Sequence, residues 1–327
     1  MYGSDDIMSN RNILVTPRSL TRTGHQSLIR LQSSGYQTVM CQPGQQPSTR
    51  ELLELLPDCV GYLAGVEPID KHVLTAATRL QVISRNGTGV NNIDLDAAKR
   101  LGISVLRAEG ANARGVAELT IGLVFSLVRE IPFSNRQLKQ LCWERRKGIE
   151  LDGRTLGLVG CGRVGQHVAV MATGMGMRVC AYDPYAGNAS LTTTPPIRFE
   201  SLANVLGQSD VVSLHCPPSP EGHPLINADS LGLMKDGAYL VNTARGELLD
   251  DQAVLDALNC DKLSGLAIDA YRREPPGNAL LIQHHKVIAT PHIGAFTSES
   301  VSRACDAAVD NLLEFLGPAR TLEENSP

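Results

Sequence analysis

Short apolar runs alternate with amphipathic stretches along the first third of the chain. The segments SLIRLQSSG and ELLELL have the spacing of helices that are apolar on one face. Between them lie runs typical of strands: NILVTP at 12–17, YQTVMC at 36–41, CVGYLAG at 59–65 and LQVISRNG at 80–87. This alternation predicts a parallel sheet, because parallel strands need a crossover connection that is usually a helix.

The same rhythm returns after residue 150. Six further apolar runs, each ending in small or polar residues, predict a doubly wound sheet. They are TLGLVGCG at 155–162, MRVCAYD at 177–183, VVSLHCP at 211–217, AYLVNTA at 238–244, LSGLAID at 263–269 and KVIATPH at 286–292. We therefore expect an α/β protein with parallel sheets.

Two longer patterns predict helices. Residues 116–141 are the longest strongly apolar helical stretch, and Pro132 is expected to break or kink it. Residues 298–317 have the pattern of one amphipathic helix, and the tail at 318–327 is expected to fray.

Composition narrows the class of protein. A chain of 327 residues is longer than one core usually grows, which favours two domains. The formal net charge of -4 provides no basic field for nucleic acid. No apolar run is long enough to cross a bilayer, and the polar first residues do not have the pattern of a signal peptide. We expect no nucleic-acid or membrane partner and a cytoplasmic location.

The sequence gives little support for a metal site. The eight cysteines lie far apart, without a Cys-x-x-Cys pair. The adjacent His284 and His285 point in different directions on any regular element and bring no further ligand at metal spacing. We expect no metal.

A glycine motif follows the strand at 155–159. Gly160, Gly162 and Gly165 have G-x-G-x-x-G spacing between an apolar run and a helical pattern, as phosphate binding at a helix N-terminus requires. Asp183 ends the next strand, where a carboxylate accepts hydrogen bonds from a ribose diol. Because this acid repels a 2'-phosphate, the motif favours NAD over NADP; the structural alternative for Asp183 is a solvated carboxylate.

Hydride transfer to or from a hydroxy acid needs a base for the hydroxyl proton, a cation for the carboxylate and an acid that tunes the base. Arg245, Glu274 and His292 follow three of the predicted strands, and ligands bind at the carboxyl ends of strands in such sheets. Each has a simpler alternative: a surface cation, a loop carboxylate and a structural histidine. Together they form a coherent acid–base set.

With these residues in place, the chain resembles the D-isomer-specific 2-hydroxyacid dehydrogenases, especially their phosphoglycerate dehydrogenase-like branch. The resemblance runs from about residue 60 to residue 300. Its blocks are RNGTGVNNIDLDAA (85–98), GANARGVAELTIGL (110–123), GRTLGLVGCGRVG (153–165), HCP (215–217), NTARGELLD (242–250), AIDAYRREPP (267–276) and TPHIGAFT (290–297).

The resemblance implies a Rossmann cofactor domain inserted into a flavodoxin-like substrate domain. The substrate domain would comprise residues 1–108 and 296–327, and the NAD-binding domain 109–295. A dimer helix at about 116–130 implies a homodimer.

The resemblance also implies roles for single residues. Arg245 would bind the substrate carboxylate and carbonyl, His292 would be the general acid/base, and Glu274 would hold His292 and stabilise its protonated form. Formate dehydrogenases carry Gln at the position of Glu274. The substrate would also meet the loop of Arg85, Asn86, Gly87 and Thr88. The NAD site would comprise Gly160, Gly162, Arg163, Val164, Gly165, Asp183, Cys216, Thr243, Ala244, Asp269 and Gly294.

The identity of the small 2-hydroxy or 2-keto acid stays open. Arg85 lies where some relatives bind a phosphate, which favours a phosphorylated or phosphonate-bearing acid. Ala64 lies near where phosphoglycerate dehydrogenases carry another Arg, which favours glyoxylate or hydroxypyruvate. In the segment 142–148, Trp143, Arg145 or Arg146 could reach a neighbouring subunit's substrate. An alternative of another class is an NAD-sensing corepressor, which would not need the acid–base set.

Overall fold

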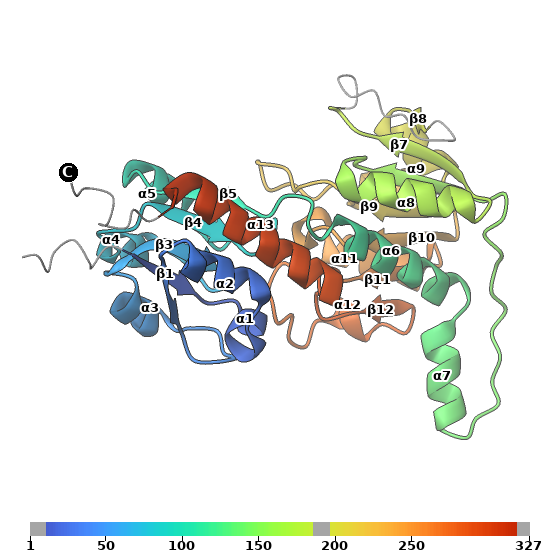
Figure 1. The fold of residues 1–327 in the computed structure, drawn as a ribbon. Helices are drawn as coiled ribbons and strands as arrows, with labels where there is room; N and C mark the ends of the chain where they lie inside the picture. The colour runs from blue at the N-terminus through green and yellow to red at the C-terminus, as the bar shows by residue number, and fades with distance from the viewer. Residues whose placement is uncertain (1–10, 186–196, 319–327) are drawn as a thin grey trace, which may run out of the picture. The chain divides into compact units, whose positions relative to one another are not determined.

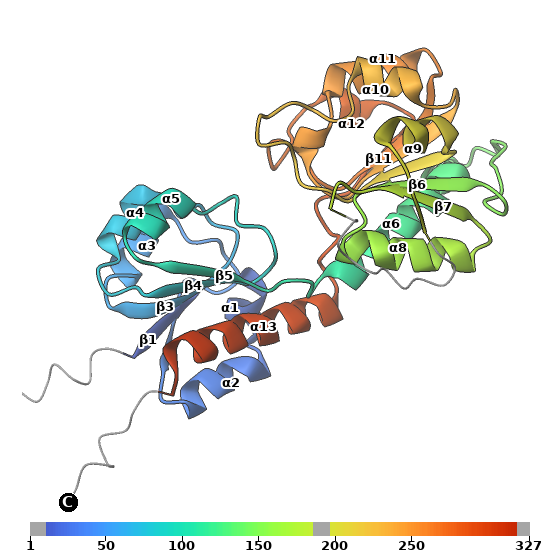
Figure 2. The same ribbon diagram turned by 90° about the horizontal axis from the view of Figure 1, so that it is seen from above.

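The computed structural model describes residues 11–185 and 197–318. The chain divides into two compact units, which are described separately (Figures 1 and 2). Unit 1 comprises Met1–Asn112 and Ser298–Pro327, and unit 2 comprises Ala113–Thr297. The sequence-based boundaries lay at 108/109 and 295/296.

Unit 1 contains a five-stranded parallel sheet. Its strands are β1 (Asn12–Val15), β2 (Gln37–Met40), β3 (Cys59–Ala64), β4 (Val82–Arg85) and β5 (Ser104–Arg107), in the order β2-β1-β3-β4-β5. The winding reverses between β1 and β3, and such a switch point is where ligands bind in open α/β sheets. The edge strand β5 was not among the predicted runs.

Helices cover both faces of this sheet. One cluster of buried apolar residues packs β1, β3 and β4 against α2 and α13, and a second packs the opposite face against α3, α4 and α5. The helices are α1 (Arg18–Thr23), α2 (Gln26–Ser33), α3 (Thr49–Leu55), α4 (Lys71–Ala76), α5 (Leu95–Arg100) and α13 (Ser298–Leu316). The C-terminal helix therefore completes the core of the N-terminal sheet; the expected frayed end beyond residue 318 lies outside the described residues.

Unit 2 contains a seven-stranded parallel sheet in the order β12-β11-β10-β9-β6-β7-β8. The strands are β6 (Thr155–Val159), β7 (Arg178–Tyr182), β8 (Arg198–Phe199), β9 (Val211–Leu214), β10 (Ala238–Asn242), β11 (Leu263–Ile268) and β12 (Val287–Ala289). Six correspond to predicted runs, and the two-residue β8 is additional. The order reverses between β6 and β9, which is the dinucleotide-binding switch point of a Rossmann sheet. The predicted doubly wound α/β class is confirmed.

The helices of unit 2 pack on both faces of its sheet. They are α6 (Ala113–Val128), α7 (Ile131–Lys139), α8 (Arg163–Gly174), α9 (Leu202–Gln208), α10 (Ala228–Leu233), α11 (Asp251–Asn259) and α12 (Leu280–Gln283), with a 3-10 turn at Gly246–Leu248. The predicted break before Pro132 is present: α6 ends at Val128, and Glu130 takes φ 52° before α7 begins. Proline is tolerated there because the first helical N–H groups have no intrahelical acceptor.

Candidate active site

The turn after β6 explains two of the three glycines of the motif, Gly160 and Gly165. A Cβ on Gly160, which has φ +92°, would lie 2.6 Å from the carbonyl oxygen of His215. A Cβ on Gly165 would lie 2.5 Å from the carbonyl oxygen of Gly160, so α8 packs directly on the turn. A Cβ on Gly162 would meet nothing within 4 Å. The N-terminus of α8 is therefore open to an anion such as a pyrophosphate.

Asp183 follows β7 and reaches back to this turn. Its Oδ2 accepts a hydrogen bond from the backbone N–H of Cys161 at 2.8 Å, and its Oδ1 accepts one from Tyr185 at 2.9 Å. Arg163 and Val164 are the first two residues of α8. The glycine turn, the open helix terminus and the fixed carboxylate fit a dinucleotide with a free ribose diol, such as NAD.

The ends of β9 and β10 border the same sheet edge. Burial raises the pKa of the Cys216 thiol to about 11, so this side chain is neutral near pH 7. The hydroxyls of Thr243 and Thr120 lie 2.9 Å apart and join β10 to α6. The backbone N–H of Ala244 donates to Oδ1 of Asn242 at 3.1 Å. These contacts hold Thr243 and Ala244, two residues of the predicted NAD site, in place.

His215 was not singled out from the sequence, although it precedes Cys216 in the HCP block. Burial lowers the pKa of its imidazole to about 4, and Nε2 lies 2.9 Å from Oγ of Ser213. Its carbonyl oxygen is the group that excludes a side chain at Gly160. His215 is thus a neutral spacer between β9 and the glycine turn.

The structure brings Glu274 and His292 together. Nδ1 of His292 lies 2.7 Å from Oε1 of Glu274, and the two side chains are 48% and 42% exposed, His292 first. An imidazole bonded to a carboxylate through Nδ1 has a fixed ring orientation and keeps Nε2 for a substrate. Half exposure leaves both groups accessible. This geometry can deliver and recover a proton.

Asp269 holds the turn that carries His292. Its Oδ1 accepts hydrogen bonds from Oγ1 of Thr290 at 2.6 Å and from the backbone N–H of Ile293 at 2.8 Å. Its Oδ2 accepts one from the backbone N–H of Gly294 at 2.8 Å. His292 adopts φ 52°, a conformation that costs a non-glycine residue about 1–3 kcal/mol. The Asp269 carboxylate offsets this cost by bonding both sides of the turn.

Tyr271 connects the two loops of the acid–base pair. Its hydroxyl donates to the carbonyl oxygen of Thr290 at 2.7 Å, and its backbone N–H donates to Oε1 of Glu274 at 3.2 Å. Burial and then the charges of Asp269 and Glu274 raise the pKa of Tyr271 to about 12, so the phenol keeps its proton. Sequence reasoning missed Tyr271, although it lies within a resembling block.

Arg245 follows β10 beside the same loops. Its Nη1 donates to the carbonyl oxygen of Ala244 at 2.7 Å, and its own carbonyl accepts from Nδ2 of Asn242 at 2.8 Å. A Cβ on the next residue, Gly246, would lie 2.2 Å from the backbone nitrogen of Arg272. The Arg245 loop is therefore in close backbone contact with the loop that leads to Glu274.

The predicted substrate loop, residues 85–88, lies in unit 1 at the end of β4, whereas the acid–base set lies in unit 2. Nη1 of Arg85 donates to the carbonyl oxygen of Asn86 at 2.7 Å, and a Cβ on Gly87 would lie 3.1 Å from the same nitrogen. Thr88 is half-buried. Oδ1 of Asn86 is buried and accepts no hydrogen bond from the described part of the chain. This loop offers a buried acceptor beside a cation.

A second arginine lies beside Arg85 on the neighbouring strand. Arg85 and Arg107 are register partners of β4 and β5, as are Ser84 and Leu106 one residue earlier. Ser84 accepts from Asn311 of α13, so the two arginines face the other side of the sheet.

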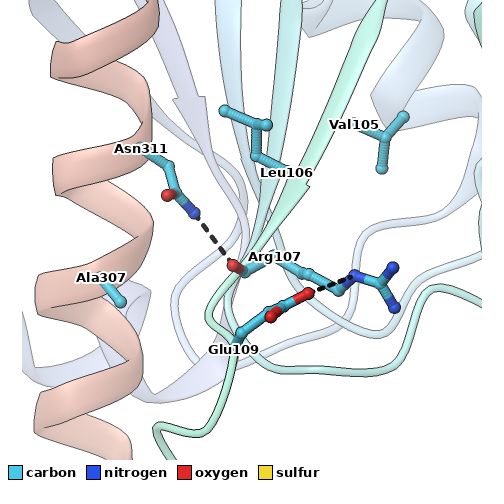
Figure 3. A pocket seen from close by; sticks show the side chains of 6 residues that line it. All are labelled: Val105, Leu106, Arg107, Glu109, Ala307 and Asn311. Atoms are coloured by element: carbon cyan, nitrogen blue, oxygen red, sulfur yellow. Dashed lines mark hydrogen bonds and ion pairs between the residues drawn. The ribbon is translucent and has the colours of Figure 1, made fainter. Parts of the chain in front are cut away.

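Figure 3 shows the Arg107 side chain extending away from α13. Its Nε lies 3.4 Å from Oε1 of Glu109. The open hollow between β5 and α13 is lined by Val105, Leu106, Arg107, Glu109, Ala307 and Asn311.

Neither a metal cluster nor a membrane helix occurs within residues 11–185 and 197–318. No group of three or more His, Cys, Asp and Glu side chains in those ranges could hold a metal ion. Among the helices of the same ranges, none combines the length and apolar character that a membrane span needs.

Most of unit 2 is similar to a known family of domains. Residues 121–294 match the model of the D-isomer specific 2-hydroxyacid dehydrogenase, NAD binding domain. The hydroxypyruvate reductase of Thermotoga maritima is 37% identical over 273 residues, which are 82% of this chain and 88% of that protein. The chain belongs to the D-isomer specific 2-hydroxyacid dehydrogenase family. Its cofactor is NAD, in agreement with the glycine turn and Asp183.

Two further likenesses define its position in the family. The D-3-phosphoglycerate dehydrogenase of Sus scrofa is 38% identical over 276 residues, which are 84% of this chain and 51% of that protein. A protein of solved structure from Thermus thermophilus is 36% identical with a TM-score of 0.82, covering 93% of this chain and 96% of the other. The chain thus spans about half the length of the curated phosphoglycerate dehydrogenases that it matches.

Proposed function

We propose that this dehydrogenase interconverts a small D-2-hydroxy acid and the corresponding 2-keto acid with NAD. The observation that carries this proposal is the 2.7 Å contact between Nδ1 of His292 and Oε1 of Glu274 at the carboxyl edge of the cofactor sheet. Members of this family are oxidoreductases, and the reaction needs an imidazole that is held in place beside a dinucleotide site. An NAD-sensing corepressor would not need this pair.

The residues divide the work of reduction. Bound at the glycine turn, NADH would supply the hydride for C2 of the keto acid. His292 donates the proton of Nε2 to the carbonyl oxygen, which gives the hydroxyl group, and Glu274 holds the imidazole through Nδ1 during that transfer. Arg245 binds the substrate carboxylate and polarises the carbonyl. In the oxidation direction His292 takes the hydroxyl proton back.

For the loop that follows β4 in unit 1 we also propose substrate contacts. Backbone amides of Asn86, Gly87 and Thr88 receive the substrate carboxylate, as in the family. The buried Oδ1 of Asn86 can accept a hydrogen bond from a hydroxyl group of the substrate.

The preferred substrate class carries a second anion, such as a phosphate or phosphonate on C3. Arg85 and its register partner Arg107 place two cations at one strand edge, and the exposed ion pair of Arg107 with Glu109 is weak enough to rearrange. Ala64 and the likeness to a hydroxypyruvate reductase support the second candidate, hydroxypyruvate or glyoxylate. A cytoplasmic location stays an expectation.

The test is a panel of keto acids with NADH and NADPH, followed by absorbance. The panel contains glyoxylate, hydroxypyruvate, pyruvate, phosphohydroxypyruvate and phosphonopyruvate. We expect the wild type to reduce a keto acid with NADH and His292→Gln to be inactive. His292→Gln should still bind NADH, as measured by a change in NADH fluorescence. Full activity of His292→Gln, or a folded NADH-binding wild type that reduces nothing in the panel, would overturn the proposal.

We also propose a homodimer formed through α6, α7 and the segment that follows. This region exposes large apolar side chains: Phe125 is 38% exposed, Leu138 58%, Leu141 95% and Trp143 81%. Arg146 lies 3.5 Å over the Phe133 ring and pairs with Glu130, so it holds the segment against α7. Exposed apolar area of this extent on a helix and its extension favours a protein partner.

A further inference from the structure

A buried carboxylate lies at the switch point of the unit 1 sheet. Glu67 is 1% exposed and follows β3, and its Oε1 is surrounded by hydrogen-bond donors. The hydroxyl of Tyr62 donates to Oε1 at 2.6 Å, the backbone N–H of Gly65 donates at 2.8 Å, and the hydroxyl of Thr16 donates as well. A buried carboxylate without such donors would cost several kcal/mol.

These donors come from different parts of the sheet. Thr16 follows β1, Tyr62 is within β3, and Gly65 begins the loop after β3. Burial and the charge of Glu67 raise the pKa of Tyr62 well above its ordinary value, so the phenol stays a donor. A Cβ on Gly65 would lie 2.6 Å from Oε2 of Glu67, so the site also requires glycine there.

The segment fixed by Glu67 is bonded to the substrate loop. The backbone N–H of Asn86 donates to the carbonyl oxygen of Ala64 at 2.9 Å. Nδ2 of Asn92 donates to the carbonyl oxygens of Glu67 at 2.7 Å and Gly65 at 3.4 Å. The two segments continue side by side through a bridge between Ile69 and Ile93. Residues 64–69 and 86–93 thus run side by side and are joined by hydrogen bonds.

We propose that Glu67 is a positioning residue for catalysis. Its carboxylate fills the switch point of the unit 1 sheet and fixes residues 64–67. Through the hydrogen bonds of those residues it sets the backbone conformation of the substrate loop at 86–88. This proposal rests on the proposed function, because it assigns Glu67 a part in holding the keto acid. Glu67 does not touch the reacting atoms; it acts through the hydrogen bonds between residues 64–69 and the substrate loop.

Three variants test the proposal. Tyr62→Phe removes one donor from Glu67, and Tyr36→Phe removes a matched buried hydroxyl that donates to the carbonyl of Gly317 at 2.8 Å in the same unit. Glu67→Gln keeps the shape and removes the charge. Hydrogen exchange of peptides covering 85–92, the KM for the keto acid and the Kd for NADH are measured for each.

We expect Tyr62→Phe and Glu67→Gln to speed exchange at 85–92 about tenfold, the effect of one lost hydrogen bond. The KM should rise about tenfold and the Kd for NADH should not change, because the glycine turn lies in unit 2. Tyr36→Phe should change neither the exchange rate at 85–92 nor the KM, even if it lowers the Tm as much as Tyr62→Phe does.

Unchanged exchange in Tyr62→Phe overturns the anchoring, and faster exchange with an unchanged KM overturns the role in catalysis. If the wild type reduces no keto acid, the proposed function fails, while the exchange experiment still decides whether Glu67 sets the loop.

Discussion

Nδ1 of His292 and Oε1 of Glu274 lie 2.7 Å apart although 18 residues separate them in the chain. The contact fixes the imidazole through Nδ1 and leaves Nε2 for the keto acid. The pair therefore sets the direction from which a proton can reach the substrate.

Glu274→Gln should slow reduction. An amide holds the Nδ1 side of the imidazole less firmly than a carboxylate, so His292 should be misplaced and kcat should fall about tenfold or more. The kcat for reduction is the measurement, with Glu247→Gln as a control in a nearby turn. An unchanged kcat would remove Glu274 from this role.

Asp269→Asn should slow catalysis by misplacing the His292 turn. An amide has only one acceptor, so either Gly294 or Ile293 loses its hydrogen bond, and kcat should fall about 10- to 100-fold. Asp250→Asn is the control for loss of the charge alone, because its two backbone N–H bonds, from Gln252 and Ala253, both go to Oδ1, which the amide can keep. Equal losses of kcat in the two variants would contradict the assignment.

Arg107→Gln should discriminate between substrates. Loss of the second cation should raise the KM for phosphohydroxypyruvate about tenfold and leave that for glyoxylate nearly unchanged. Arg79→Gln, which alters an ion pair with Asp58 at the edge of the same unit, is the control. A parallel change for both substrates would place Arg107 outside the specificity site.

Trp143 offers a direct assay of the proposed dimer, because it is the single tryptophan of the chain. It is 81% exposed in the protomer, so its emission should shift to the blue as the protein concentration rises and subunits associate. Leu141→Glu should weaken association and restore the red-shifted emission, as checked by light scattering. If light scattering shows that dimers form and the emission wavelength of Trp143 does not change, Trp143 lies outside the interface.

Much of the structure of the NAD-binding unit can be predicted from local sequence patterns. The order strand, glycine turn, helix, strand and Asp183 follows from spacing alone, because only glycine allows the close approaches at Gly160 and Gly165. Pro132 likewise ends a helix through its own covalent geometry. Such patterns depend on residues that are close in the sequence, so they can be interpreted without knowledge of the tertiary structure.

Other features required the tertiary structure. The sequence pointed to Asp269 as a cofactor contact, but only the fold reveals that both of its oxygens bond the His292 turn. Arg107 became a candidate only when β5 was found in register with β4. Glu67 looks like an ordinary loop carboxylate until Thr16 and Tyr62 meet it. Hydrogen bonds between distant segments depend on strand order and side-chain direction, and those are decided when the sheets assemble.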